Sequence, residues 1–186
     1  RDYYCDWSSD VCSSDLLLLG GGALAAKVLA FAHKLTEAIY SYGAGAMEAP
    51  AWIPGHGPKL KALVFDASDL QHTDQLKQLR EFFQPLLKNL DHSAHLVILG
   101  RAPESLSDPF AASAQRALEG FSRSLAKELR NGGVLQLLSV GQGAEDQLEG
   151  ALRFFLSPKS AYISGQVIRL EACTKIGRAS CRERVY

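Results

Sequence analysis

The feature that most constrains the fold of this chain is an alternation of short apolar runs with longer amphipathic stretches, which begins at Leu16. Strands buried on both faces of a parallel sheet are continuous apolar runs, whereas the helices between them carry apolar residues at steps of three and four. The apolar runs are residues 16–19, 60–66, 95–99, 134–140 and 166–170. This alternation predicts an α/β fold, a Rossmann or flavodoxin-like three-layer sandwich with a mostly parallel sheet.

The amphipathic stretches predict the helices between these strands. Apolar residues recur at helical spacing over residues 24–39, 73–90, 109–129 and 145–156. Pro85 predicts a kink in the second helix. Asp108 followed by Pro109 predicts the start of the third, as an N-cap followed by proline at the first helical position. A short strand is expected to end near Met47 and Glu48, and residues 53–58 are expected to form a loop.

Length and charge limit the classes of function. A chain of 186 residues with 47% hydrophobic residues suits one buried domain. Its 20 basic and 20 acidic residues create no overall field for nucleic acid or an anionic membrane. The first apolar run is stopped by three glycines before it could cross a bilayer, and the aspartates before it argue against a signal peptide. We therefore expect a cytoplasmic domain without nucleic-acid or membrane partners. His92 and His95 are expected to be structural, with no metal site.

The two ends of the chain are related at the level of possible codons. Residues 12–15 can be encoded by a DNA segment whose reverse complement encodes residues 176–179, an inverted repeat that resembles translated sequencing adapters. We expect residues 1–16 and 175–186 to be adapter-derived and residues 17–174 to be the domain. Three of the four cysteines then fall in the flanks, namely Cys5, Cys12 and Cys181, so a disulfide framework is not expected.

A glycine-rich turn follows the first strand and offers the first candidate site. Gly20, Gly22 and Ala25 satisfy the pattern G-x-G-x-x-A between a strand and a helix, where backbone N–H groups and the helix dipole can hold a pyrophosphate. Gly20 and Gly22 are the candidate cofactor-binding residues. Three consecutive glycines match many patterns, and Glu37 and Glu48 are poorly placed to bind a ribose. A tight turn without a ligand is the alternative.

Two segments carry a resemblance to a known family. Residues 117–129 read Ala-Leu-Glu-Gly-Phe-Ser-Arg-Ser-Leu-Ala-Lys-Glu-Leu, and residues 160–167 read Ser-Ala-Tyr-Ile-Ser-Gly-Gln-Val. Both resemble segments of the short-chain dehydrogenases/reductases, most closely of the 3-oxoacyl-acyl-carrier-protein reductases. Those enzymes bind NADP(H) or NAD(H), and they use a Tyr-x-x-x-Lys pair on the helix that contains the first segment.

The same resemblance implies that the catalytic residues are missing. The family's Tyr falls on Ala111 and its Lys on Gln115. Asp66 lies where the family has an Asn, and Arg101 lies close to the position of its catalytic Ser. Alanine and glutamine cannot replace the proton donor and the lysine that lowers its pKa. No catalytic residue and no cofactor are therefore expected in this chain.

The chain most resembles the degenerate, flavodoxin-like N-terminal domain of high-molecular-weight 3-oxoacyl-acyl-carrier-protein reductases, which precedes an active ketoreductase domain. This implies a non-catalytic domain that packs on the downstream ketoreductase domain or forms a homo-oligomer, with Ala111, Ala112 and Ala114 on a helix that the family uses for subunit packing. Acyl carrier protein or coenzyme A thioesters would be reached only through the full-length protein. The alternatives are an active NAD(P)H-dependent reductase of 3-oxoacyl thioesters and a nucleotide-binding module.

Overall fold

The computed structural model describes residues 17–34, 36–43, 49–53 and 59–172. The predicted adapter-derived segments, residues 1–16 and 175–186, lie outside the described residues, and so do Met47, Glu48 and all four cysteines. The domain boundaries and the origin of the two ends therefore stay predictions.

Six parallel strands form the central sheet in the described part of the chain. They are paired in the order β2-β1-β3-β4-β5-β6, so the predicted strand at residues 60–66 is an interior one. This arrangement confirms the predicted α/β fold class. The strands are β1 (Leu17–Gly21), β2 (Ile39–Ser41), β3 (Leu60–Asp66), β4 (Leu90–Arg101), β5 (Val134–Val140) and β6 (Gln166–Leu170).

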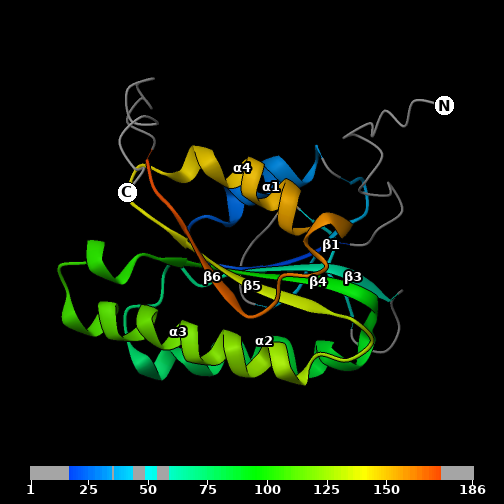
Figure 1. Cartoon of the computed structure of the whole chain (residues 1–186), viewed down its shortest axis with the longest axis horizontal. Helices are drawn as coiled ribbons and strands as arrows, with labels where there is room; N and C mark the ends of the chain where they lie inside the picture. The colour runs from blue at the N-terminus through cyan, green and yellow to red at the C-terminus, as the bar shows by residue number, and fades with distance from the viewer. Residues whose placement is uncertain (1–16, 35, 44–48, 54–58, 173–186) are drawn as a thin grey trace, which may run out of the picture.

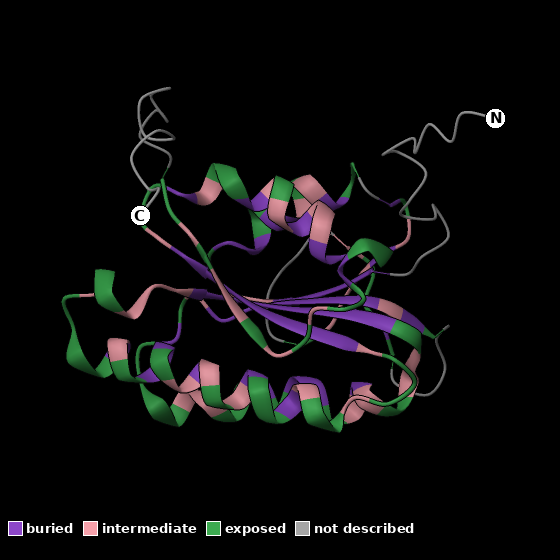
Figure 2. Cartoon of the chain, viewed as in Figure 1, coloured by how far each residue is buried: buried purple, intermediate pink, exposed green. Residues whose placement is uncertain are grey.

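Helices cover both faces of the sheet and complete three layers (Figure 1). One face carries α1 (Ala25–Ala32) and α4 (Leu148–Phe155), and the other carries α2 (Lys77–Leu86) and α3 (Pro109–Glu128). Buried residues line the strands and the inner sides of these helices (Figure 2). The strand residues therefore alternate between two cores, one for each layer of helices. Single 3-10 turns are η1 (Thr73–Leu76), η2 (Leu87–Asn89), η3 (Pro103–Ser105), η4 (Glu145–Gln147) and η5 (Pro158–Ser160).

The predicted helix over residues 24–39 is too long. α1 ends at Ala32, and Ile39 begins β2, where it pairs in register with Leu17 of β1. Ile39 is buried among the apolar residues of the same core as α1. Its spacing from the helix therefore reflects a shared core and not a continuous helix.

The predicted helix over residues 73–90 is divided into three parts. A 3-10 turn, η1, leads into α2, and a second one, η2, follows it. Pro85 lies next to the last residue of α2 and has no N–H to donate, so the helix tightens and ends there instead of continuing beyond a kink. Leu90 belongs to β4, which is longer at both ends than the predicted strand over residues 95–99.

The start of α3 is as predicted. The Asp108 carboxylate accepts hydrogen bonds from the backbone N–H groups of Phe110 and Ala111, and Pro109 is the first helical residue. An N-cap of this kind stabilises a helix by about 1 kcal/mol. At 20 residues α3 is long enough to cross a bilayer, but its exposed face is polar, and no helix among the described residues meets the requirements for a membrane span.

Candidate functional site

The strand order identifies where an α/β sheet of this kind can bind a ligand. β1 lies between β2 and β3, so the chain leaves β1 toward one side and returns to the sheet on the other. A crevice opens at such a switch point, outside the carboxyl ends of the two central strands. Here that edge is formed by Gly21 at the end of β1 and Asp66 at the end of β3, which are paired in register. The predicted glycine-rich turn and Asp66 therefore meet at the expected position.

Two neighbouring hollows open at this edge. The first is lined by Gly22, Asp66, Asp69 and Gln75 among others and has a volume of about 400 Å³. The second, of about 470 Å³, is lined by Tyr42, Phe82 and polar residues of α2. Gly21 borders both. This crevice is therefore a candidate ligand site at the switch point.

Two of the three glycines of the turn have a reason within the protein to lack a side chain. A Cβ atom at Gly20 would overlap the ring of Phe82. Gly21 has a φ of 100°, and a Cβ there would overlap the backbone carbonyl of Asp66. A Cβ at Gly22 would lie 2.7 Å from Asp69 Oδ2. The contacts at Gly20 and Gly21 account for those glycines without a bound phosphate, whereas Gly22 faces only the end of a side chain. They favour the alternative of a tight turn.

The amino-terminal end of α1 is occupied by the carboxylate of Asp66. Its Oδ2 accepts a hydrogen bond of 2.5 Å from the backbone N–H of Leu24, the N-cap residue of α1, and its Oδ1 accepts one of 2.9 Å from Ser68 N. Burial raises the pKa of Asp66 above its ordinary value of 3.8, although these hydrogen bonds lower it, and Asp69 nearby adds to the rise. The protein's own acid thus takes the position of an anionic ligand.

These contacts decide whether a nicotinamide dinucleotide fits the turn. Its pyrophosphate would compete with Asp66 for the N–H of Leu24 at the start of α1, and it would lie beside Asp69 as well. Two carboxylates next to a doubly charged pyrophosphate are repulsive. The residues present do not fit this group, and Gly20 and Gly22 remain phosphate-binding residues by prediction alone.

Gln115, at the position of the family's catalytic lysine, is fully engaged in backbone contacts. The side chain is 3% exposed. Its Nε2 donates to the carbonyls of Ala67 and Leu70, at 2.8 and 3.2 Å, and its Oε1 accepts from Arg101 N at 2.8 Å. Gln115 therefore links α3 to the segment after β3 and to the end of β4.

The other positions of the missing catalytic set are also part of the structure. Ala111, at the tyrosine position, is buried one turn before Gln115 on the same face of α3. The Arg101 guanidinium pairs with Glu145 Oε1 at 2.7 Å, and this hydrogen bond lowers the pKa of Glu145. Tyr162, in the segment that resembles the family before β6, is fully exposed. None of these side chains forms a proton relay with another in the described structure.

Other sequence-based interpretations can now be compared with the structure. His92 is exposed and His95 is buried, and among the described residues no group of three potential ligands could hold a metal. Ala111 and Ala114 are buried within the chain and Ala112 is half-buried, and the expectation that this helix serves subunit packing stays a prediction. The structural role of Gln115 was missed, because its three partners lie in segments that only the fold brings together.

Comparisons with known proteins agree at the level of the fold. No family model matches the sequence, and no curated protein sequence matches it either. Among solved structures, the chain is similar to an enoyl-[acyl-carrier-protein] reductase (NADH) from Aquifex aeolicus, with a TM-score of 0.71, 14% identity, and coverage of 87% of this chain and 96% of that one.

Two further solved structures give the same result. A putative short chain dehydrogenase from Escherichia coli CFT073, complexed with NADPH, has a TM-score of 0.70 and 12% identity, with 87% of this chain and 98% of that one covered. A short-chain dehydrogenase/reductase from Serratia marcescens has a TM-score of 0.66 and 13% identity, with 84% and 96% covered. The chain therefore has the Rossmann-like fold of the short-chain dehydrogenases/reductases.

Proposed function

We propose that this chain is a reductase-like domain that does not transfer hydride itself and serves to pack against an active reductase domain or a second copy of itself. The observation that carries the proposal is Gln115. A catalytic lysine at this position must reach a cofactor ribose and a tyrosine hydroxyl, whereas Gln115 is buried and bonded to three backbone groups. Together with Ala111 at the tyrosine position, this leaves the described helix α3 without the family's Tyr-Lys pair for proton transfer to substrate.

The finer part of the proposal rests on the resemblance of residues 117–129 and 160–167. It assigns the chain to a 3-oxoacyl-acyl-carrier-protein reductase whose downstream ketoreductase domain holds NADP(H) or NAD(H) and the thioester substrate. Acyl carrier protein or coenzyme A would then contact the full-length protein only. The enoyl-[acyl-carrier-protein] reductase (NADH) and the putative short chain dehydrogenase complexed with NADPH share the fold, which is compatible with this assignment.

The β6 edge of the sheet supports a packing role. Among the described strands, β6 pairs with β5 alone. Its Val167, Ile168 and Leu170 are half-buried, whereas every residue of β5 is buried. Tyr162, in the turn that leads to β6, is fully exposed. Half-buried aliphatic residues and an exposed tyrosine beside an open strand edge are typical of a surface that another protein covers.

Titration with NADPH, followed by an assay with an acetoacetyl thioester, tests the catalytic part. We expect neither saturable binding nor turnover. Turnover would overturn the proposal in favour of an active reductase with an unusual catalytic set. Saturable binding without turnover would favour the nucleotide-binding module, and Gly22→Ala and Asp69→Asn would then show whether the nucleotide lies in the switch-point crevice.

Sedimentation over a range of protein concentrations, with and without a purified ketoreductase domain, tests the packing part. We expect association that Ile168→Glu weakens, because the charge would be buried at the β6 edge. Gln78→Glu, which adds the same charge to an exposed position on α2, is the matched control and should leave association unchanged. A chain that stays monomeric and does not associate with the ketoreductase domain at any concentration would contradict the packing role.

A further inference from the structure

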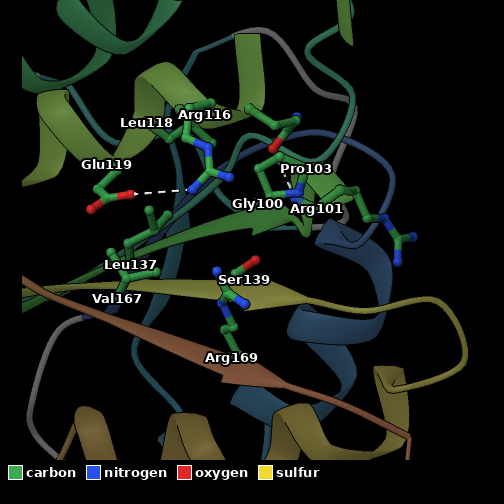
Figure 3. A pocket seen from close by; sticks show the side chains of 11 residues that line it. Gly100, Arg101, Pro103, Arg116, Leu118, Glu119, Leu137, Ser139, Val167 and Arg169 are labelled. Carbon is green, nitrogen blue, oxygen red and sulfur yellow. Dashed lines mark hydrogen bonds and ion pairs between the residues drawn. The ribbon is translucent and has the colours of Figure 1, made fainter. Parts of the chain in front are cut away.

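A small cavity lies between α3 and the sheet (Figure 3). It shares no lining residue with the switch-point crevice. Its lining includes Gly100 at the end of β4, Ser139 of β5, Arg169 of β6 and Arg116 of α3. Its volume is about 30 Å³. A cavity needs about 10–15 Å³ on this measure to hold one water, so the space admits one or two oxygen-sized atoms. It is too small for a substrate but large enough for the charged end of one.

Ser139 supplies a polar group without a partner at this cavity. Its side chain is 6% exposed, and its Oγ makes no hydrogen bond within the protein. Side chains alternate along β5, so Ser139 faces the α3 layer together with Leu135 and Leu137. Buried hydroxyl groups are nearly always hydrogen-bonded to protein or to water. A molecule that satisfies Ser139 Oγ must therefore place a polar atom in the cavity.

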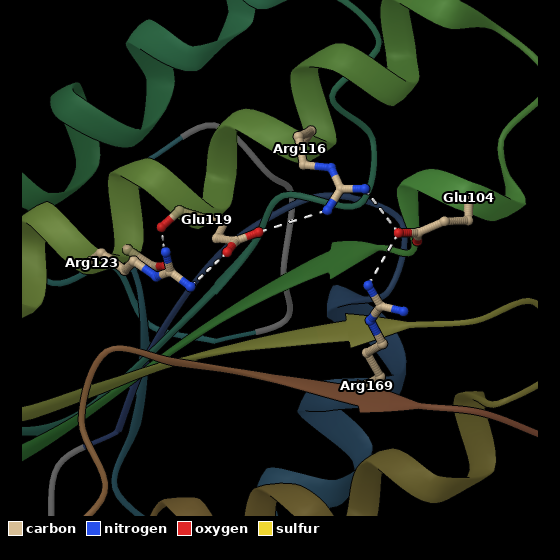
Figure 4. A network of polar contacts seen from close by, with 6 residues as sticks. Glu104, Arg116, Glu119, Arg123 and Arg169 are labelled. Carbon is tan, nitrogen blue, oxygen red and sulfur yellow. Dashed lines mark hydrogen bonds and ion pairs between the residues drawn. The ribbon is translucent and has the colours of Figure 1, made fainter.

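Two arginines from different elements meet at the mouth of the same cavity. Arg116 Nη2 and Arg169 Nη2 both donate to Glu104 Oε1, at 2.9 and 3.1 Å (Figure 4). One carboxylate oxygen is therefore already held between two guanidinium groups. Guanidinium groups suit carboxylates because several N–H donors lie in one plane. The contact with Glu104 shows which chemistry this pair of arginines accepts.

The Glu104 side chain is able to give way to another anion. Its side chain is 48% exposed, and it extends from the 3-10 turn η3, while the two arginines are 56% and 57% exposed. Exposed ion pairs of this kind contribute little to stability, so exchanging one carboxylate for another costs little. Glu119 also approaches Arg116, at 3.8 Å, but it is held more closely by Arg123, at 2.7 Å.

We propose that the cavity is a binding site for the carboxylate end of a small molecule, held by Arg116 and Arg169 and by a hydrogen bond from Ser139 Oγ, with Glu104 as a built-in competitor. The incoming carboxylate takes the place of Glu104 between the guanidinium groups and extends one oxygen toward Ser139. The site does not depend on the proposed packing role or on a nicotinamide cofactor. It belongs to the β4 to β6 half of the sheet, away from Asp66.

Calorimetric or NMR titration of the whole chain with malonate at constant ionic strength tests this site. We expect weak, saturable binding, with a dissociation constant on the order of 1 mM, because the site contacts only one carboxylate of this small dianion. Arg169→Gln and Ser139→Ala should each weaken binding by about tenfold or more, since each removes a hydrogen bond to a charged group. Glu104→Gln should tighten it severalfold, because it removes the competitor.

Two control variants separate the site from a general effect of charge. Lys127→Gln removes a positive charge from an exposed position in the last turn of the same helix and should leave binding unchanged. Glu149→Gln removes a negative charge from α4 on the opposite layer and should also have no effect. Inorganic phosphate in place of malonate shows whether the site prefers carboxylates.

Three results would overturn the anion site, and a fourth would overturn its assignment to carboxylates. The first is an absence of saturable binding in both the wild type and Glu104→Gln. The second is binding that Ser139→Ala leaves intact, which would place the anion on the surface arginines alone. The third is equal tightening by Glu104→Gln and Glu149→Gln, which would indicate net charge instead of competition at the site. Stronger binding of phosphate than of malonate would overturn the assignment to carboxylates.

Discussion

The carboxyl edge of the sheet has two halves that handle negative charge in opposite ways. At β1 and β3, Asp66 is buried and bound by backbone N–H groups, and burial raises its pKa. At β4 and β5, Glu145 is bound by the Arg101 guanidinium, and that hydrogen bond lowers its pKa. The arginines Arg116 and Arg169 lie on the second half as well. One half is therefore acidic and the other carries the cations.

This difference indicates where a ligand could bind. A dinucleotide would place its pyrophosphate on the acidic half, where Asp66 already uses the start of α1. An anion is better received on the other half, although its arginines are already paired with the protein's own acids. The fold thus offers a phosphate site at the ends of β1 and β3, whereas the charges favour an anion site beside β4 and β6.

The largest effect is expected for Gly21→Ala on the acidic half. The added Cβ would require both an unfavourable positive φ and a shift of the backbone carbonyl of Asp66. Strain and overpacking of this kind each cost about 1–3 kcal/mol, so we expect a loss of about 4 kcal/mol in the free energy of unfolding. Urea denaturation measures it.

Gly120→Ala is the matched control for this change. Gly120 lies inside α3, and a Cβ there meets nothing within 4 Å. Alanine in a helix interior is better than glycine by about 0.5–1 kcal/mol, so this variant should be stabilised. If Gly21→Ala lowers the free energy of unfolding no more than Gly120→Ala does, the close contact between β1 and the Asp66 carbonyl does not exist in the protein. The turn would then have room for a phosphate.

The next effect is expected for Gln115→Ala, which lies between the two halves. The change leaves the carbonyls of Ala67 and Leu70 and the N–H of Arg101 without their partner. A buried group left without a partner costs about 1–3 kcal/mol. We expect the free energy of unfolding to fall by about 3 kcal/mol in total, because water can reach some of these three backbone groups. Gln84→Ala, whose amide accepts only from exposed Arg80, should change stability by less than about 0.5 kcal/mol.

A loss of similar size in both glutamine variants would contradict the structural role of Gln115. Gln115→Lys, which restores the residue of the reductase family, provides a second test of that role through stability and NADPH binding. A buried lysine that replaces three backbone hydrogen bonds should destabilise the domain as well. Stability equal to the wild type, with gain of NADPH binding, would instead mean that this position still belongs to a cofactor site.

Much of the fold could be predicted from local patterns, and the two halves show why the rest could not. β5 and β6 have the predicted bounds, and the Asp108 cap is where the sequence places it. Local signals suffice for these features, because they depend on neighbouring residues. Ile39 was assigned to a helix because its spacing suits a buried position in either structure, and only the pairing with Leu17 distinguishes the two.

The site is harder to predict because its contacts join distant segments. The hydrogen bond between Leu24 and Asp66 spans 42 residues, and the one between Gln115 and Ala67 spans 48. The family resemblance of residues 117–129 identified Gln115 as a departure from a catalytic lysine, but the three backbone groups that bind it become neighbours only once the strand order is known. The same holds for Arg116 and Arg169, which meet across two elements.

A smaller effect, with a defined sign in pH, is expected from Asp66. Because its folded pKa lies above the ordinary 3.8, the folded state holds the proton more tightly than the unfolded state. Its contribution to stability is therefore present below about pH 4 and is lost as pH rises through the folded pKa. The difference in unfolding free energy between wild type and Asp66→Asn should fall from pH 4 to pH 7. A difference that rises over this range would show that Asp66 is stabilised as a carboxylate.

The smallest effect is expected from Arg101→Gln, and its pH dependence has the opposite sign. The hydrogen bond from Arg101 lowers the pKa of Glu145 below its ordinary 4.5, so the pair stabilises the fold above that pH and is lost as pH falls through the lowered pKa. The pair is partly exposed, so we expect Arg101→Gln to lower the free energy of unfolding by at most about 1 kcal/mol at pH 7. This difference from the wild type, measured by urea denaturation, should disappear in acid and should shrink in high salt at pH 7. A difference that persists in acid would mean that Arg101 acts through packing, and the contrast between the two halves would then rest on Asp66 alone.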